Sequence, residues 1–354
     1  MNFEHETLGQ RVFFGSGKAN EYLKQEVERR AATNIMVIAS KREMVRAENV
    51  LDRVDVSIVH DDVVQHVPFH NAQRARRTAV DNDIDFVVSI GGGSATGLAK
   101  AVALTTGLPI VAVPTTYAGS EATDVWGITQ GGKKTTGVDR RALPATVIYD
   151  AQLTLTMPPE LSISSGLNAL AHCVDSLWAP HADPINAAMA TEGIRALSQG
   201  LPAVAATPDD LRGREHTLYG AHLAAVAFAS AGSGMHHKIC HALGGRFNLP
   251  HAQMHAVMLP YVLAFNATTV PAVAERIANA LGSDNAVEGL SALHTSLGAP
   301  KALSDYGLAE SDLDEAAQFI LPLIPASNPR PVTPENLTRL LRSAWAGDAP
   351  TARA

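Results

Sequence analysis

Cysteine is nearly absent from this sequence: among 354 residues only Cys173 and Cys240 occur. Two isolated cysteines supply neither a disulfide framework nor a CxxC pair, and such sparse use suits a reducing compartment. The first residues, Met-Asn-Phe-Glu-His-Glu, are acidic and contain no apolar segment, which argues against a secretory signal. These absences predict a cytoplasmic protein.

Long apolar runs, aromatic residues and a net positive charge are also lacking. No run approaches the ~20 apolar residues that a membrane-spanning helix requires. Aromatic residues make up 5% of the chain, and the formal net charge is −7 with histidine neutral. Because nucleic-acid-binding surfaces are usually basic, we expect neither a nucleic-acid partner nor a membrane partner. The 46% apolar and 18% charged residues are typical of a globular protein with a sizeable core.

The first part of the chain alternates short apolar runs with helical stretches. The runs are rich in Val and Ile and lie at residues 35–39, 54–59, 86–90, 110–113 and 146–149. Helical patterns lie between several of them, at residues 18–30 and 95–105. Near-continuous apolar strands separated by helices are typical of a parallel sheet that is covered on both faces. We therefore predict an α/β N-terminal domain over residues 1–157, Rossmann-like and built on a mostly parallel sheet.

The second part of the chain has a different pattern. From Leu161 onward the sequence is rich in Ala and Leu at helical spacing, and β-branched runs nearly vanish. Pro158 and Pro159 mark the boundary, since paired prolines end regular structure. We predict an all-α C-terminal domain over residues 158–354, so that the chain has the length expected of two domains.

A glycine-rich turn follows one of the predicted strands. Gly-Gly-Gly-Ser occupies residues 91–94, directly after the run at 86–90 and before a helix expected from Ala95. Glycine allows the backbone to approach a pyrophosphate, and the helix N-terminus offers free N–H groups. Ser94 is expected to cap this helix and to donate to a phosphate oxygen. The pattern is not G-x-G-x-x-G, so a tight turn with a serine cap is the alternative.

A second polar loop follows the next strand. It spans residues 114–121, where Thr115 and Thr116 offer hydroxyl groups and Gly119-Ser120 permits close approach. Ligands of open α/β sheets bind at the carboxyl ends of the strands. A loop whose hydroxyls satisfy only its own backbone is the alternative. Two such loops after neighbouring strands favour a nucleotide site.

Histidines are concentrated in the predicted helical domain, where five fall within one short stretch: His236, His237, His241, His251 and His255. His237 and His241 are four residues apart and share a helix face, and Asn168 and His172 have the same spacing. Such a cluster in an otherwise apolar segment favours a metal or catalytic site over satisfied core histidines.

The composition of this cluster resembles a metal site that lacks its anionic ligand. Zinc and iron sites combine imidazoles with carboxylates. His172, His237 and His251 offer three nitrogen ligands, but their neighbour on the earlier helix is Asn168 and not an aspartate. A neutral amide oxygen binds a divalent ion much less well than a carboxylate does.

Together these motifs resemble the iron-containing, group III alcohol dehydrogenases over nearly the whole chain. The resemblance rests on Phe-Gly-Ser-Gly at residues 14–17, the two loops at 91–94 and 114–121, and the histidine-rich stretch 234–260. It implies the dehydroquinate synthase-like fold of that family. It also implies an active site in the cleft between the two domains, and a homodimer.

Carried over residue by residue, the resemblance implies a nicotinamide-dinucleotide site. Gly92, Gly93 and Ser94 would cradle the pyrophosphate, Thr115, Thr116 and Ser120 would line the cofactor cleft, and Lys134 would approach the ribose and phosphate. A solvated surface lysine is the alternative for Lys134. After the first strand comes Ser40, followed by two basic residues, where NAD-preferring members often carry an aspartate. We therefore expect NADPH to be accepted alongside NADH.

The same resemblance assigns the histidines. His172, His237 and His251 match three metal-ligand histidines, and His241 matches a fourth histidine of the active site. Asn168 departs from the ligand aspartate. Within the family, the chain looks closest to the maleylacetate reductases, a branch that does without the metal, and Asn-Pro-Arg-Pro at residues 328–331 also fits that branch. No metal is therefore expected.

The implied reaction is NAD(P)H-dependent reduction of the conjugated C=C bond of maleylacetate to 3-oxoadipate in aromatic-compound degradation. Hydride adds to the carbon β to the ketone, and negative charge develops on the ketone oxygen. Histidines suit the stabilisation of that charge. We expect this small dicarboxylate substrate to be bound by Asn168, His236, Lys238 and Arg246. Adjacency in sequence is the warrant for Lys238 and Arg246, and both are equally compatible with surface positions.

Two other functions compete with this one. The first is an Fe- or Zn-dependent alcohol dehydrogenase acting on a small alcohol or aldehyde, against which Asn168 argues. The second is a nucleotide-binding protein that has kept the fold and lost its chemistry, against which the intact histidine set argues.

Overall fold

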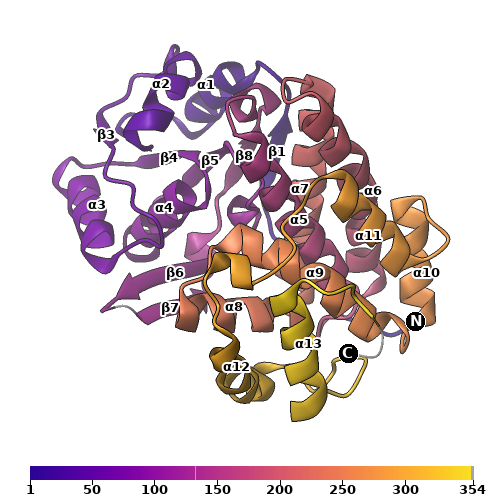
Figure 1. The fold of residues 1–354 in the computed structure, drawn as a ribbon. Coiled ribbons are helices and arrows are strands. Elements are labelled where there is room, and N and C mark those ends of the chain that lie inside the picture. The colour runs from indigo at the N-terminus through magenta and orange to yellow at the C-terminus, as the bar shows by residue number, and fades with distance from the viewer. Residues whose placement is uncertain (132, 352–354) are drawn as a thin grey trace. The chain divides into compact units, whose positions relative to one another are not determined.

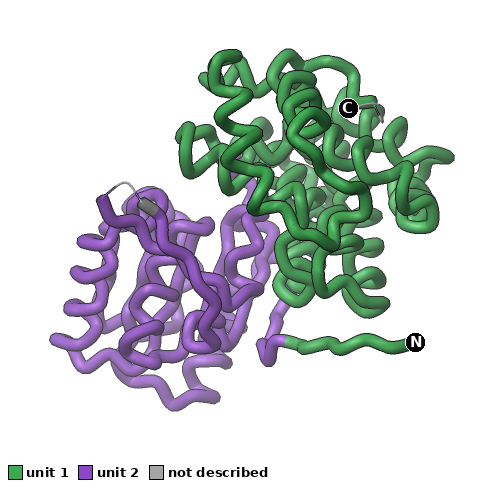
Figure 2. The backbone as a smooth tube through the Cα atoms, turned by 90° about the horizontal axis from the view of Figure 1, so that it is seen from below, with its two compact units in different colours: residues 1–7, 158–354 green, residues 8–157 purple. Residues whose placement is uncertain are grey.

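We analysed a computed structural model of the chain, which describes residues 1–131 and 133–351. The backbone divides into two compact units, which Figure 2 shows in different colours. One comprises Leu8–Met157 and the other comprises Met1–Thr7 with Pro158–Ala354. The first seven residues therefore belong with the second unit, although the sequence pattern placed them in the first domain. His5 connects this segment to the second unit, because its Nδ1 lies 2.8 Å from an Asp183 carboxylate oxygen.

The first unit is built on a six-stranded parallel sheet (Figure 1). The strand order is β1-β8-β5-β4-β2-β3, and every neighbouring pair is parallel. The strands are β1 (Arg11–Phe14), β2 (Ile35–Ile38), β3 (Ile58–His60), β4 (Phe86–Gly91), β5 (Ile110–Pro114) and β8 (Thr146–Tyr149). A separate antiparallel ribbon joins β6 (Val125–Gln130) to β7 (Lys133–Val138).

Helices cover both faces of this sheet. The side chains of β2 alternate between two cores: Ile35 and Val37 belong to one, and Met36 and Ile38 to the other. The first core includes residues of α1 (Ala19–Arg30) and α2 (Lys41–Leu51). The second includes residues of α3 (Phe69–Asp81) and α4 (Gly93–Thr106). The predicted α/β architecture with a mostly parallel sheet is confirmed, and burial on both faces explains why its strands are continuously apolar.

Several element boundaries differ from the predicted ones. The run at residues 54–59 forms a strand only over Ile58–His60, and the helix expected from Ala95 begins at Gly93. Its N-cap is Gly92, so the prediction that Ser94 caps this helix was wrong. Ser94 lies in the first helical turn, because the backbone already turns at Gly91. The φ of Gly91 is 144°, which suits glycine.

The second unit is all-helical, as predicted. Its helices are α5 (Pro159–Ser176), α6 (Pro184–Ala206), α7 (Leu211–Ala231), α8 (Met235–Phe247), α9 (His251–Ala267), α10 (Pro271–Leu281), α11 (Ala286–Ser296), α12 (Leu313–Ile320) and α13 (Pro334–Ala346). Pro158 is the N-cap of α5 and Pro159 its first residue, where a missing N–H costs nothing. One core joins residues of α8, α9, α12 and α13. Within residues 1–131 and 133–351, no helix has both the length and the apolar character needed to span a bilayer.

Candidate active site

The glycine turn and the polar loop of the first unit lie side by side. They follow β4 and β5, which pair in parallel so that Gly91 is opposite Pro114. The Thr115 N–H donates to the Gly91 carbonyl over 3.1 Å. A Cβ at Gly92 would lie only 3.0 Å from Thr116 Cγ2, so a side chain at 92 would force the two loops apart. The structure thus brings Gly92 and Thr116 together beside the free N–H groups of the α4 N-terminus.

A buried lysine, which the sequence did not predict, donates hydrogen bonds to the chain that follows the polar loop after β5. Lys100 of α4 is fully buried and donates to the Thr123 carbonyl at 2.8 Å and to the Val125 carbonyl at 2.7 Å. Burial lowers the pKa of Lys100 to about 7. Glu121, in the same loop, accepts a hydrogen bond from Tyr149 over 3.0 Å. These contacts fix the chain that follows the two threonines, as a cofactor site requires.

The three other residues expected at the cofactor site lie at the start of a helix, in a short turn and on the antiparallel ribbon. The Ser40 hydroxyl caps α2 by accepting from the Glu43 N–H over 3.3 Å. Its helix reaches the glycine turn, since a Cβ at Gly91 would lie 3.6 Å from Glu43 Cγ. Ser120 begins the short 3₁₀ turn after β5. Lys134 is exposed on β7 and pairs with Thr129 of β6.

Four histidines of the second unit lie in one cluster built by three helices. His172 comes from α5, His237 and His241 from α8, and His251 from α9. His172 stacks on His237 with ring centroids 4.7 Å apart, and the rings of His237 and His241 are 5.9 Å apart. His172 and His237 are buried, whereas His241 and His251 are exposed. The four predicted catalytic histidines are therefore contiguous and range from buried to solvent-exposed.

His255 is the centre of this cluster, and sequence reasoning gave it no role. Its ring centroid lies 4.3 Å from that of His251, 4.9 Å from that of His237 and 5.0 Å from that of His236. Its position one helical turn after His251 was the signal that could have found it. Burial also changes the pKa values of the clustered histidines. It lowers the pKa of His172 to about 3, and it holds the pKa of His237 and His255 well below the usual value, so these rings are neutral near pH 7.

Several buried polar atoms in and beside this cluster have no hydrogen-bond partner among the described residues, and Asn168 Oδ1, His172 Nδ1 and His237 Nε2 are among them. Buried polar groups in proteins are nearly always paired. Unpaired atoms on two neighbouring helices are typical of a site that a ligand or water completes. Asn168, His172 and His237 are thus suited to hold a polar ligand.

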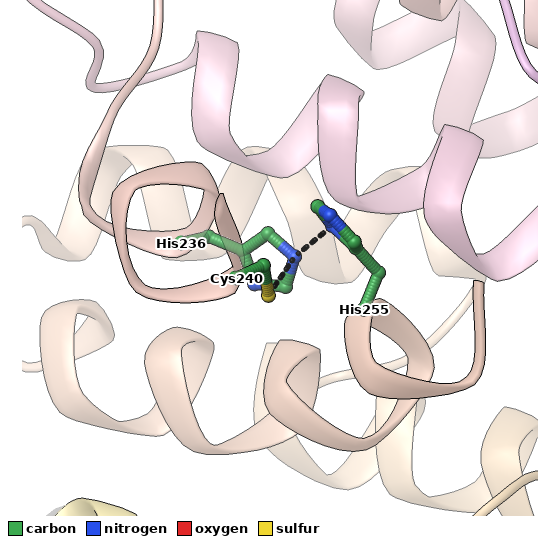
Figure 3. Close-up of side chains that lie close together, drawn as sticks. All are labelled: His236, Cys240 and His255. Carbon is green, nitrogen blue, oxygen red and sulfur yellow. Dashed lines mark hydrogen bonds between the residues drawn. The ribbon is translucent and has the colours of Figure 1, made fainter. Parts of the chain in front are cut away.

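A second group of close side chains consists of His236, Cys240 and His255 (Figure 3). His236 Nε2 lies 3.0 Å from His255 Nδ1 and 3.7 Å from the Cys240 sulfur. One ligand atom from each of the three lies within 4.8 Å of the others, which makes the group a candidate for a metal ion. However, a metal-bound histidine normally donates its other N–H to a partner. His236 Nδ1 and His255 Nε2 are buried without one among the described residues, so we interpret this group as a hydrogen-bonded cluster.

The side chains at the family's ligand positions offer an iron ion no carboxylate. Among residues that the structure describes, His236, Cys240 and His255 are the one set of His, Cys, Asp or Glu side chains that converges closely enough for a metal. His172, His237 and His251 are not part of this set, and Asn168 brings no negative charge.

The two cationic side chains expected to bind substrate carboxylates have different surroundings. Lys238 is half-buried on α8. Arg246 lies at the end of the same helix, is exposed, and forms an ion pair with Glu315 of α12. Its guanidinium also lies 5.5 Å from the Phe319 ring centroid. The structure engages Arg246 in packing α8 against α12, which weakens its assignment to the substrate.

Two family models match this chain. Residues 9–151 match the model of iron-containing alcohol dehydrogenase, and residues 162–345 match that of the Fe-containing alcohol dehydrogenase family, C-terminal. The chain belongs to the iron-containing alcohol dehydrogenase family. The resemblance inferred from the motifs is therefore confirmed.

Within this family, the similarity to maleylacetate reductases extends over nearly the full length. The chain is 45% identical over 345 residues to maleylacetate reductase 2 of Cupriavidus pinatubonensis, covering 96% of each chain. The structure of maleylacetate reductase from Agrobacterium tumefaciens is 37% identical with a TM-score of 0.94, covering 99% of this chain and 100% of that one. A protein of Corynebacterium glutamicum described as iron-containing alcohol dehydrogenase is 60% identical with a TM-score of 0.99, covering 100% and 99%.

Proposed function

We propose that this protein is a maleylacetate reductase, which reduces the conjugated C=C bond of maleylacetate to give 3-oxoadipate. The observation that carries the proposal is the near-full-length similarity to maleylacetate reductases. Asn168 supports it, because an amide at this position leaves the histidine cluster without the carboxylate that a metal-dependent alcohol dehydrogenase would use.

We propose that the cofactor is NADH or NADPH and that its pyrophosphate binds at Gly92, Gly93 and the α4 N-terminus. The glycine turn fits this group, because Gly93 has no side chain and a Cβ there would meet only Ala118, at 3.7 Å. When bound, the reduced dinucleotide supplies the hydride. Ser40 caps α2 with no carboxylate at its own position, which leaves room for a 2′-phosphate.

In this proposal the substrate ketone lies at the histidine cluster. The buried rings of His172 and His237 are neutral, so they act through N–H donors and lone pairs and not as fixed cations. Hydrogen bonds from the cluster stabilise charge that develops on the ketone oxygen after hydride reaches the β carbon. Burial of His172 and His237 strengthens the hydrogen bonds that these two rings make.

Metal-independent turnover and dimer formation complete the proposal. The first follows from the donor set around Asn168, and the second from family membership. The competing function is a metal-dependent alcohol dehydrogenase, which the name of the Corynebacterium relative favours.

The deciding assay uses protein treated with chelator and checked for residual metal. Oxidation of NADH and NADPH is followed with maleylacetate and then with small aldehydes. We expect turnover of maleylacetate without metal. Activity confined to aldehydes and restored by iron or zinc would instead establish the alcohol dehydrogenase.

Histidine variants test the site in the same assay. We expect His237→Ala and His241→Ala to lower kcat/KM by about 10²- to 10⁴-fold, the usual contribution of acid–base groups. His216→Ala, on α7 and outside the cluster, is the matched control and keeps its activity. Unchanged kcat/KM in both cluster variants would contradict the histidine assignment.

A further inference from the structure

A buried carboxylate lies against the N-terminus of α8, the helix that carries His236, His237 and His241. Asp175, near the end of α5, is fully buried. Its Oδ2 lies 2.8 Å from His237 Nδ1 and accepts from the Gly234 N–H over 2.9 Å. Its Oδ1 accepts from the His236 N–H over 3.2 Å. One side chain of α5 therefore caps α8 and holds the ring of its third residue.

The sequence is adapted to this close approach at Gly234. A Cβ at this residue would lie 2.4 Å from Asp175 Oδ1, closer than any side chain tolerates. The φ of Gly234 is −87°, so its backbone does not itself require glycine. Glycine is needed here because the carboxylate occupies the space of the missing side chain.

This contact decides which nitrogen of His237 carries the proton. A carboxylate can only accept, so His237 Nδ1 must be the donor. The backbone N–H groups of Gly234, His236 and His237 all donate to the Asp175 carboxylate, and such donors favour its ionised form. The positive end of the α8 dipole also favours the anion. In neutral His237 the lone pair is then on Nε2, which is buried without a partner among the described residues.

We propose that Asp175 is a positioning residue that locks His237 in the Nδ1–H tautomer and presents its Nε2 to the substrate. The inference deepens the proposed function and its catalytic meaning rests on it. The reduction consumes one hydride at the β carbon and one proton at the carbon α to the ketone. The Nε2 lone pair of neutral His237 takes up that proton from solvent and passes it to the α carbon, and the Asp175 carboxylate stabilises the transient imidazolium through Nδ1–H. The tautomer itself does not depend on what the substrate is.

The test is the variant Asp175→Asn, compared with wild type by imidazole ¹⁵N NMR of protein labelled in histidine. The His237 signals are identified by their loss in His237→Gln. We expect wild type to show Nδ1 protonated, and Asp175→Asn to show the Nε2–H form as well, because an amide can also donate to Nδ1. We also expect kcat to fall about 10- to 100-fold with little change in KM for the dinucleotide.

Asp183→Asn is the matched control. Asp183 is also a buried aspartate of this unit that caps a helix, accepting from Ile185 N–H at 2.7 Å and Asn186 N–H at 2.9 Å, and it also lies 2.8 Å from a histidine, His5. Its substitution is expected to lower stability while leaving kcat and the His237 tautomer unchanged.

Each outcome separates the two proposals. An Nε2–H form of His237 in wild type, which is seen without any change at Asp175, overturns the role of Asp175. So does an unchanged tautomer or an unchanged kcat in folded Asp175→Asn. A wild type that shows the Nδ1–H form but never reduces maleylacetate would leave the tautomer lock intact and refute the proposed function instead.

Discussion

Gly234 shows how a single residue ties the stability of α8 to the chemistry of its histidines. The space for its side chain is occupied by the Asp175 carboxylate. We expect Gly234→Ala to lower the free energy of unfolding by about 1–3 kcal/mol, the usual cost of overpacking. Because the carboxylate must move, reductase activity should fall as well. Urea unfolding and steady-state kinetics on the same preparation measure both effects.

Gly245, in the last turns of the same helix, is the control for this substitution. A Cβ at Gly245 would meet nothing within 4 Å. Gly245→Ala should therefore be neutral or stabilise by up to about 1 kcal/mol, because alanine restricts the unfolded chain. Equal losses of stability in the two variants would show that helix propensity, and not the approach of Asp175, determines the cost at 234.

At this scale the sequence pointed to four catalytic histidines, included His255 in the cluster without giving it a role, and did not point to Asp175. Helical spacing places His237 beside His241, and this could be read directly. Asp175 and His237 are far apart in sequence, and no local pattern states that α5 brings its carboxylate to the start of α8. The pairing of Arg246 with Glu315 was hidden for the same reason.

At the scale of elements, Glu26 joins α1 to the sheet. Its side chain is fully buried and accepts from Thr146 of β8 at 2.7 Å, from Arg29 at 2.7 Å and from Arg30 at 2.8 Å. Burial alone would raise the pKa of Glu26, but the hydrogen bonds from Arg29, Thr146 and Arg30 outweigh it and lower the pKa to about 2. The ionised side chain of Glu26 therefore links α1 to β8 through its hydrogen bond with Thr146.

The sign of the resulting pH dependence follows directly. The pKa of Glu26 is lower in the folded chain than the ordinary 4.5, so its contribution is complete above about pH 5 and is lost as pH falls toward 2. We expect Glu26→Gln to cost about 1–3 kcal/mol at pH 7 and progressively less below pH 4.5. Urea titrations at several pH values measure the difference.

Glu28, on the same helix, serves as the comparison. It is exposed and lies 3.6 Å from Lys24, so Glu28→Gln should change stability by no more than about 0.5 kcal/mol at any pH. A pH-independent penalty for Glu26→Gln would mean that packing, and not the charge of Glu26, holds α1 to β8.

Elements with strong local patterns were predicted and elements without them were missed. The strands β2, β4, β5 and β8 are fully buried and mostly apolar. The strand β1 and the β6–β7 ribbon have partly exposed residues and little patterning, so nothing in the sequence marked them. The N-cap of α4 was misassigned because Ser94 is the better capping residue in isolation, while the positive φ of Gly91 sets the turn earlier.

For the whole molecule, the proposed homodimer gives a direct prediction. The chain has a mass of 37.3 kDa, so light scattering coupled to size exclusion should give about twice that value. We expect the dimer to persist across a tenfold dilution. A mass equal to one chain at micromolar concentration would refute the dimer while leaving the proposed reaction untouched.

The sequence by itself determined the fold class, the glycine turn, the polar loop and the histidine-rich helix, because each depends on neighbouring residues whose spacing is set by helix and strand geometry. Tertiary structure alone decided that Thr116 lies against Gly92, that Lys100 supports the loop after β5, and that Asp175 fixes the tautomer of His237. These contacts join segments distant in the chain, and burial then sets their charge states. No local pattern encodes either the partner or the desolvation, so they become readable only once the chain is folded.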